Sequence, residues 1–136
     1  MNKKGFTLIE LLAVIVILAI IALIVTPVVS NIISSARKAA NARSVEGHVK
    51  NIEYAIIQKA FEEGTGDLSI ADSLTTDTAV KATLTIPAGD KIECSTIAIS
   101  NGTVTSASGC KDPSWTDSFT YTEGAGAQAV ANTNNG

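Results

Sequence analysis

The sequence predicts an α+β fold in which one long N-terminal helix packs by its second half against a small antiparallel sheet of three to four strands. An apolar stretch runs from Phe6 to Val29, and the segment after it, to Glu63, repeats apolar residues at helical spacing. Beyond Gly64 the pattern changes to strand-like alternation and turn dipeptides.

Residues 6–29 form the first segment and are long enough to cross a membrane. A hydrocarbon core of ~30 Å needs ~20 helical residues, and only Thr7, Glu10 and Thr26 interrupt the apolar composition. Two lysines, Lys3 and Lys4, precede the segment. Because positive charge favours the cytoplasmic side, we expect the N-terminus in the cytoplasm and the rest of the chain outside it.

Residues 30–63 predict an amphipathic continuation of the same helix. Pro27 cannot donate a backbone hydrogen bond, so a kink is expected near it. The apolar face of the continuation is Ile32, Ala36, Ala40, Val45, Val49, Ile52, Ile56 and Ala60. Gly64 is expected to end the helix.

Residues 64–122 predict a small β head that begins with a loop pinned by Leu68, Ile70 and Leu74. Alternation over 80–86 predicts one strand and residues 91–100 a second. Asn101-Gly102 is the strongest hairpin signal and predicts a third strand after it, which makes a three-strand meander. Phe119 and Tyr121 suggest a fourth strand, whereas residues 123–136 have the composition of a flexible tail.

The two cysteines, Cys94 and Cys110, predict a disulfide, since their segment should lie outside the cytoplasm. A two-residue loop at 101–102 pairs Ile99 with Val104 and leaves Cys110 one position out of register. The disulfide therefore requires one bulge within 107–109 or fraying of the strand there.

Charge and motif content exclude several functions. Residues 64–136 hold three lysines and eight acidic residues, so direct nucleic-acid binding by the head is not expected. Catalytic motifs, metal-ligand spacings and cofactor sequences are lacking, so the sequence indicates neither an enzyme nor a cofactor. His48 is interpreted as a solvated or packed side chain, and Trp115 as a packing anchor rather than a ligand platform.

The N-terminal motif Gly5-Phe6-Thr7-Leu8-Ile9-Glu10-Leu11-Leu12 resembles the class III signature of type IV pilins and of the pseudopilins of type II secretion and competence systems. The resemblance covers about the first 60 residues, and it implies the pilin fold. It also implies that a prepilin peptidase removes residues 1–5 by cutting between Gly5 and Phe6, and that the new amine of Phe6 is methylated.

Glu10 is the only charged residue between Lys4 and Arg37. A carboxylate in a membrane helix costs on the order of 2.5 to 3.5 kcal/mol and needs a partner. Cleavage would create a cation at Phe6, so Glu10 could pair with its own Phe6 amine or with that of a neighbouring subunit. The resemblance favours the neighbour and implies that Phe6 and Glu10 direct assembly.

The resemblance therefore implies a structural subunit of a type IV pilus, a helical homo-oligomer that serves adhesion, motility or colonisation. The subunit would be a single-pass membrane protein before assembly and part of an extracellular filament afterwards. A membrane platform and an ATPase would assemble it, and Pro27 would let the helix loosen. Two alternatives are a pseudopilin for secretion or DNA uptake, and a monomeric membrane anchor that displays a binding domain.

Overall fold

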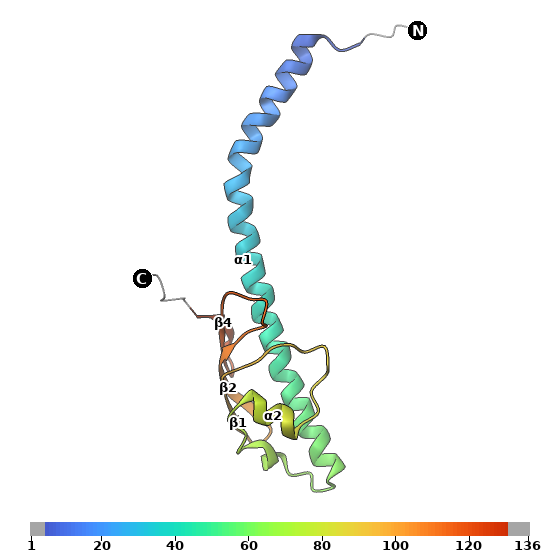
Figure 1. Ribbon diagram of the computed structural model, residues 1–136, viewed down its shortest axis with the longest axis vertical. Helices are drawn as coiled ribbons and strands as arrows, with labels where there is room; N and C mark the ends of the chain where they lie inside the picture. Colours follow the sequence, from blue (N-terminus) through green and yellow to red (C-terminus); the bar gives the residue numbers. More distant parts are fainter. Residues whose placement is uncertain (1–4, 131–136) are drawn as a thin grey trace. The chain divides into compact units, whose positions relative to one another are not determined.

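The computed structural model describes residues 5–130, and its longest element is the helix α1, Leu8–Glu62 (Figure 1). Residue contacts divide the chain into two compact units, Met1–Arg37 and Lys38–Gly136. The first unit contains the apolar half of α1. The second contains the other half of α1, a short helix and a sheet.

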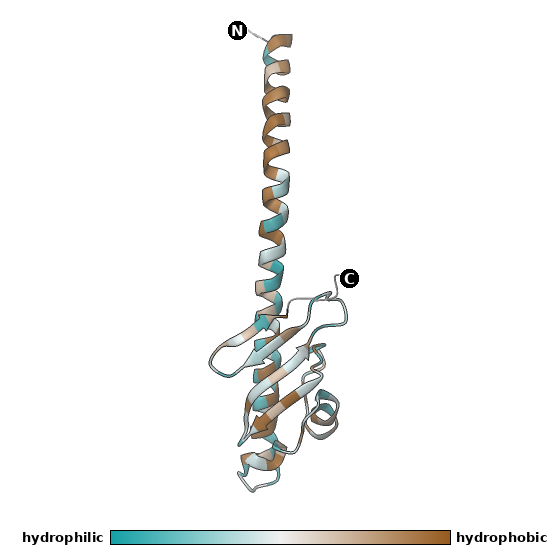
Figure 2. Ribbon diagram, turned by 90° about the vertical axis from the view of Figure 1, so that its left-hand side faces the viewer, coloured by the Kyte–Doolittle hydropathy of each residue, from teal (hydrophilic) through white to brown (hydrophobic). Residues whose placement is uncertain are grey.

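The first half of α1 is apolar, as its brown ribbon in Figure 2 shows, and it is exposed along its whole length. Phe6, just before α1, and the large apolar side chains of α1 from Leu8 to Ile33 are between 40% and 85% exposed. The helix continues through Pro27 without a break in secondary structure. The hydroxyl of Thr26, the residue directly before Pro27, donates to the carbonyl oxygen of Ala22 at 2.6 Å. The kink near Pro27 stays a prediction.

The second unit contains one four-stranded antiparallel sheet in the order β1-β2-β3-β4, which confirms the α+β class. The strands are β1 Thr96–Ser100, β2 Thr103–Cys110, β3 Phe119–Thr122 and β4 Gly126–Ala129. The hairpin between β1 and β2 is confirmed. Asn101 and Gly102 have φ values of 49° and 84°, the left-handed backbone that a two-residue primed turn requires.

One face of the sheet packs against the second half of α1 and forms the core of the head (Figure 2). In β1 the buried residues Ile97 and Ile99 alternate with exposed ones. In β2 the buried residues Val104, Ala107 and Cys110 lie three apart, because the register shifts at two places along this strand. The helix contributes Val45, Val49, Ile52, Ala55 and Ile56, and the strands contribute Ile97, Ile99, Val104, Ala107, Phe119 and Tyr121.

The predicted strand over 80–86 is wrong, because this segment begins in the helix α2, Asp77–Thr83. Thr76 caps α2 by accepting the backbone N–H of Ala79 at 3.3 Å. Val80 and Leu84 are both buried, four residues apart, as expected for a helical turn rather than a strand. Local capping and this burial spacing therefore outweigh the alternation in the sequence.

Two further expectations need correction. The predicted strand over 91–100 is regular only in β1, although Glu93 forms an isolated bridge with Lys111. The flexible tail predicted for 123–136 is wrong at Gly126–Ala129, where β4 pairs with β3. Residues 131–136 lie outside the described residues.

The disulfide between Cys94 and Cys110 is present, with an S–S distance of 2.06 Å. Ile99 pairs with Val104 as predicted, and a bulge follows. This bulge falls at Thr105, between Val104 and Ser106, rather than within 107–109. The extra residue shifts the register by one, so the cysteines lie directly opposite each other next to the Glu93 bridge.

The free edge of β1 is covered by the segment before α2. The backbone N–H of Ile97 donates to the carbonyl oxygen of Thr75 at 2.9 Å. Asp72, at the end of the 3₁₀ helix Leu68–Ala71, accepts the N–H of Asn101 at 2.8 Å. The predicted anchors Leu68, Ile70 and Leu74 pack against the core. This cover protects the edge strand from pairing with another chain.

Candidate functional site

The N-terminal segment brings the predicted processing and assembly residues next to each other in the chain. Gly5, Phe6 and Thr7 precede α1 and are exposed. A Cβ added to Gly5 would meet no atom within 4 Å. The folding of the described chain therefore does not require glycine at this position.

Thr7 and Glu10 form a capping box at the start of α1. The hydroxyl of Thr7 accepts the backbone N–H of Glu10 at 3.3 Å, and the Glu10 carboxylate accepts the N–H of Thr7 at 3.1 Å. Two N–H groups that the helix start leaves unpaired are thereby satisfied. Sequence reasoning missed the role of Thr7, although the Thr-x-x-Glu spacing before an apolar run signals it.

The capping box defines what Glu10 contacts in a single chain. Its carboxylate lies at the helix N-terminus, where the macrodipole favours negative charge. It is bonded to the amide of Thr7, the residue directly after Phe6. A cation formed on the Phe6 nitrogen would therefore be one residue away along the backbone.

The apolar half of α1 provides a large surface that the described chain leaves uncovered. By length and composition, α1 is the one helix of residues 5–130 that could cross a membrane. Such a surface can lie in lipid or pack against other apolar helices.

Comparison with known families matches residues 1–26 to the prokaryotic N-terminal methylation motif. The chain thus carries the class III signature that type IV pilins and pseudopilins share, and its architecture is pilin-like. This match points to a structural protein of the pilin type. Neither the curated proteins nor the solved structures include a match to this chain.

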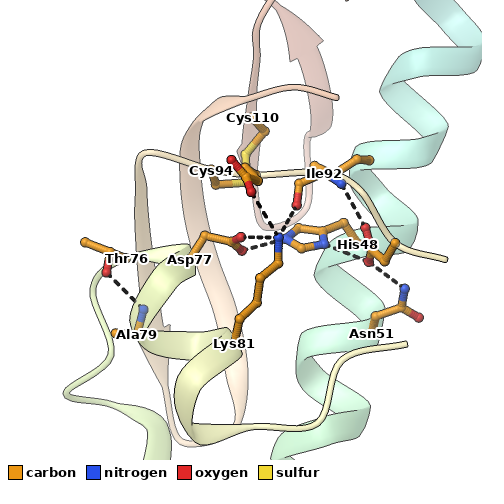
Figure 3. Close-up of polar contacts among 11 residues, drawn as sticks. His48, Asn51, Thr76, Asp77, Ala79, Lys81, Ile92, Cys94 and Cys110 are labelled. Atoms are coloured by element: carbon orange, nitrogen blue, oxygen red, sulfur yellow. Dashed lines mark hydrogen bonds and ion pairs between the residues drawn. A yellow bond between two sulfur atoms is a disulfide. The ribbon is translucent and has the colours of Figure 1, made fainter. Parts of the chain in front are cut away.

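His48 occupies a second polar site, inside the head (Figure 3). Its side chain projects from α1 and is fully buried between two carboxylates. Nε2 lies 2.8 Å from Asp77 of α2, and Nδ1 lies 2.7 Å from Asp90 of the following loop. Packing of His48 is confirmed, but its two acidic partners were not predicted, because they come from distant parts of the sequence.

The two carboxylates favour the charged form of the imidazole. Burial alone would lower the pKa of His48, but the hydrogen bonds to Asp77 and Asp90 and their negative charges outweigh it and raise the pKa above 6.5. Burial would raise the pKa of Asp77, yet its hydrogen bonds from His48 and Lys81 lower it below 3.8. A protonated His48 donates through both ring nitrogens, which matches two carboxylate acceptors.

The remaining bonds of this cluster tie three segments together. Lys81 lies 2.8 Å from the second oxygen of Asp77 and donates to the carbonyl oxygen of Ile92 at 3.0 Å. Asn51 donates to Asp90 at 2.7 Å. We call His48, Asn51, Asp77, Lys81 and Asp90 the histidine clamp. It links α1, α2 and the loop before β1, and its two cations balance its two anions.

Metal binding has no support in the part of the chain that the structure describes. Residues 5–130 hold no group of three His, Cys, Asp or Glu side chains that could ligate a metal ion. Trp115 is partly buried and packs edge-on against Phe119, with ring centroids 5.6 Å apart. This contact confirms a packing role for Trp115.

Proposed function

We propose that this protein is a structural subunit of a type IV pilus, which polymerises through the apolar half of α1 into a surface filament. A prepilin peptidase cuts between Gly5 and Phe6, and the new Phe6 amine is methylated. The head is carried on the outside of the fibre. Before assembly the subunit spans the membrane once, with its N-terminus in the cytoplasm.

The observation that carries this proposal is the methylation motif directly before an uncovered apolar helix. Residues 1–26 carry the motif, and the large apolar side chains from Phe6 to Ile33 are all at least 40% exposed. Gly5 is exposed, and the packing of the chain does not require glycine there. A glycine at this position is consistent with recognition by a peptidase that cuts after it. A monomeric anchor needs the apolar helix but not this motif.

Glu10 provides the specificity of assembly in this proposal. Among residues 5–130 of the single chain, its carboxylate is bonded only to the backbone N–H of Thr7, at the helix N-terminus. The methylated Phe6 amine of a neighbouring subunit adds an opposite charge, and a charge pair gains strength where water is excluded. Burying apolar helices against each other merely replaces lipid by protein, so the pair sets which neighbour and which axial position are favoured.

The test compares Glu10→Ala with Glu62→Ala, a matched control on the same helix within the head. Electron microscopy of sheared surface material, labelled with an antibody to the head, measures filament yield. We expect Glu10→Ala to stay in the membrane fraction and to lose filaments, and Glu62→Ala to retain both. Normal filament yield from Glu10→Ala refutes the role of this carboxylate.

Intact-mass measurement of the purified protein tests the processing step separately. The mature chain should begin at Phe6 and carry one additional methyl group. A chain that retains Met1 and forms no filaments identifies a monomeric anchor instead. A processed chain that yields no sheared surface fibres identifies a pseudopilin, because pseudopilins share the motif and the helix.

A further inference from the structure

The head contains an open cleft that neither the core nor the proposed assembly surface uses. Its volume is about 420 Å³, and it lies between α1, the loop before β1 and the turn after β2. Sites for small molecules occupy roughly 300 to 1,000 Å³. The cleft is therefore large enough for a compact ligand.

Apolar and polar groups are combined in the cleft lining. Trp115 and Pro87 supply apolar surface, whereas Lys91, Asp112 and Asn51 supply polar groups. Among residues 5–130, Lys91 Nζ has no hydrogen-bond or ion-pair partner. Asp112 uses one carboxylate oxygen for Ser114 and keeps the other for solvent.

Hydrogen bonds within the chain fix the walls of the cleft without a ligand. The backbone N–H of Trp115 donates to the carbonyl oxygen of Asp112 at 2.9 Å, and Asp112 Oδ1 accepts the N–H of Ser114 at 2.8 Å. On the opposite wall, Asp90 is held by the histidine clamp. A site formed before binding loses less entropy when a ligand enters.

Gly47 provides a separate indication that the cleft is kept open. It lies inside α1, where glycine costs roughly 0.5 to 1 kcal/mol relative to alanine. A Cβ added there would meet no atom within 4 Å, so packing does not demand glycine. Because Gly47 lines the cleft, a larger side chain would project into its space.

The charges in the cleft restrict the chemistry of its ligand. Lys91 supplies a cation and Asp112 an anion. The pKa of the Asp112 carboxyl is lowered by two hydrogen bonds from Ser114 and also by the positive charge of Lys91 nearby. A ligand with a single charge of either sign would meet a like charge. A neutral ligand with hydroxyl groups can accept from Lys91 and donate to Asp112.

We propose that this cleft binds a neutral carbohydrate, with one pyranose ring against the indole of Trp115 and its hydroxyls between Lys91 and Asp112. The C–H face of a pyranose is apolar and planar enough to cover an aromatic ring, while its rim is polar. Asn51 keeps its carbonyl oxygen for a further hydroxyl, since its amide group already donates to Asp90. The cleft does not depend on filament formation.

The experiment uses the full processed chain in a detergent without a sugar head group. The chain has one tryptophan, so its fluorescence reports directly on the cleft. Methyl glycosides of glucose, galactose, mannose and N-acetylglucosamine are the neutral probes, and glucuronate and trimethylammonium are the charged ones. We expect a saturable fluorescence change with at least one neutral glycoside and weaker binding of both charged probes.

Three variants and one control assign the binding to this cleft. Gly47→Leu should abolish the saturable change while leaving the head folded. Lys91→Gln and Asp112→Asn should each weaken binding about tenfold, because each removes a hydrogen bond to a charged group. Lys111→Gln, a matched lysine change outside the cleft, should bind like the unaltered protein.

Several outcomes would overturn the proposal. They are the absence of saturable change with every neutral glycoside, retention of binding in Gly47→Leu, and tighter binding of a charged probe. Circular dichroism of each variant verifies that the head is folded. If Gly47→Leu does not fold, the paired comparison of Lys91→Gln with Lys111→Gln decides the question alone.

Discussion

Replacement of His48 by leucine tests the histidine clamp most directly. Leucine fills a similar volume but leaves Asp77 and Asp90 without the imidazolium that donates to both at 2.8 and 2.7 Å. Breaking a buried ion pair by removing one partner costs about 3 to 5 kcal/mol. Lys81 still pairs with Asp77, and Asn51 still donates to Asp90. We therefore expect the free energy of unfolding to fall by about 3 kcal/mol, the lower end of that range.

The same prediction has a defined pH dependence. Because the folded pKa of His48 is raised above 6.5, its contribution is complete below pH 6.5 and is lost as the pH rises through the folded pKa. Because the folded pKa of Asp77 is lowered below 3.8, its contribution is complete above pH 3.8 and is lost as the pH falls through the folded pKa. The difference in free energy of unfolding between wild type and His48→Leu should therefore be largest between pH 3.8 and pH 6.5 and shrink at alkaline pH.

Urea unfolding of the full chain in detergent, followed by Trp115 fluorescence, measures this difference. The chain has one tryptophan and one histidine, so the signal and the titration both belong to the head. Lys59→Gln is the control, because it removes an exposed ion pair with Glu63 and should cost no more than about 1 kcal/mol. Equal stability of wild type and His48→Leu, or a difference that stays constant from acid to alkaline pH, would refute the charged clamp.

Three further changes test the disulfide, the left-handed backbone at Gly109 and the capping box. The bond between Cys94 and Cys110 spans 16 residues. Changing both cysteines to serine should lower the free energy of unfolding of the head by roughly 3 kcal/mol in the same urea assay. An unchanged urea midpoint would contradict this stabilising role of the disulfide. Gly109→Ala should destabilise the head by about 1 to 3 kcal/mol because φ is +64° there, and Gly89→Ala, which has open space and an ordinary φ, is its control in thermal unfolding. Thr7→Ala should destabilise the first turn of α1 by about 0.5 to 2 kcal/mol, which faster amide hydrogen exchange in that turn would show. Thr7→Ser should preserve the cap. Equal exchange rates in the two variants would show that the Thr7 hydroxyl does not stabilise the helix start.

Much of the candidate assembly site could be read from the sequence because it is local. The apolar run, the proline and the Gly-Phe-Thr-Leu-Ile-Glu motif all lie within 30 residues, and a helix satisfies its own backbone hydrogen bonds in any environment. Thr7 belongs to this local information too, since a capping box is defined by a spacing of three residues.

Short-range signals also conflicted, and the structure resolved the conflict. Residues 80–86 alternate like a strand, yet Thr76 supplies a cap and Asp77 pairs with Lys81 four residues on. The alternation alone cannot decide between the two periods in so short a segment. Burial of Val80 together with Leu84 against the core selects the helix.

By itself the sequence determined the long helix, the class III motif and the hairpin at Asn101-Gly102, because each depends on neighbours in the chain. It also predicted the disulfide, since the two cysteines of the chain lie in a segment expected outside the cytoplasm. Only the tertiary structure decided that Thr105 is the bulged residue and that His48 lies between Asp77 and Asp90. The two carboxylates are 29 and 42 residues from His48. No periodicity connects such positions, since they meet only when α2 and the loop before β1 fold onto α1. The cleft beside Trp115 arises in the same way, from three segments that packing brings together.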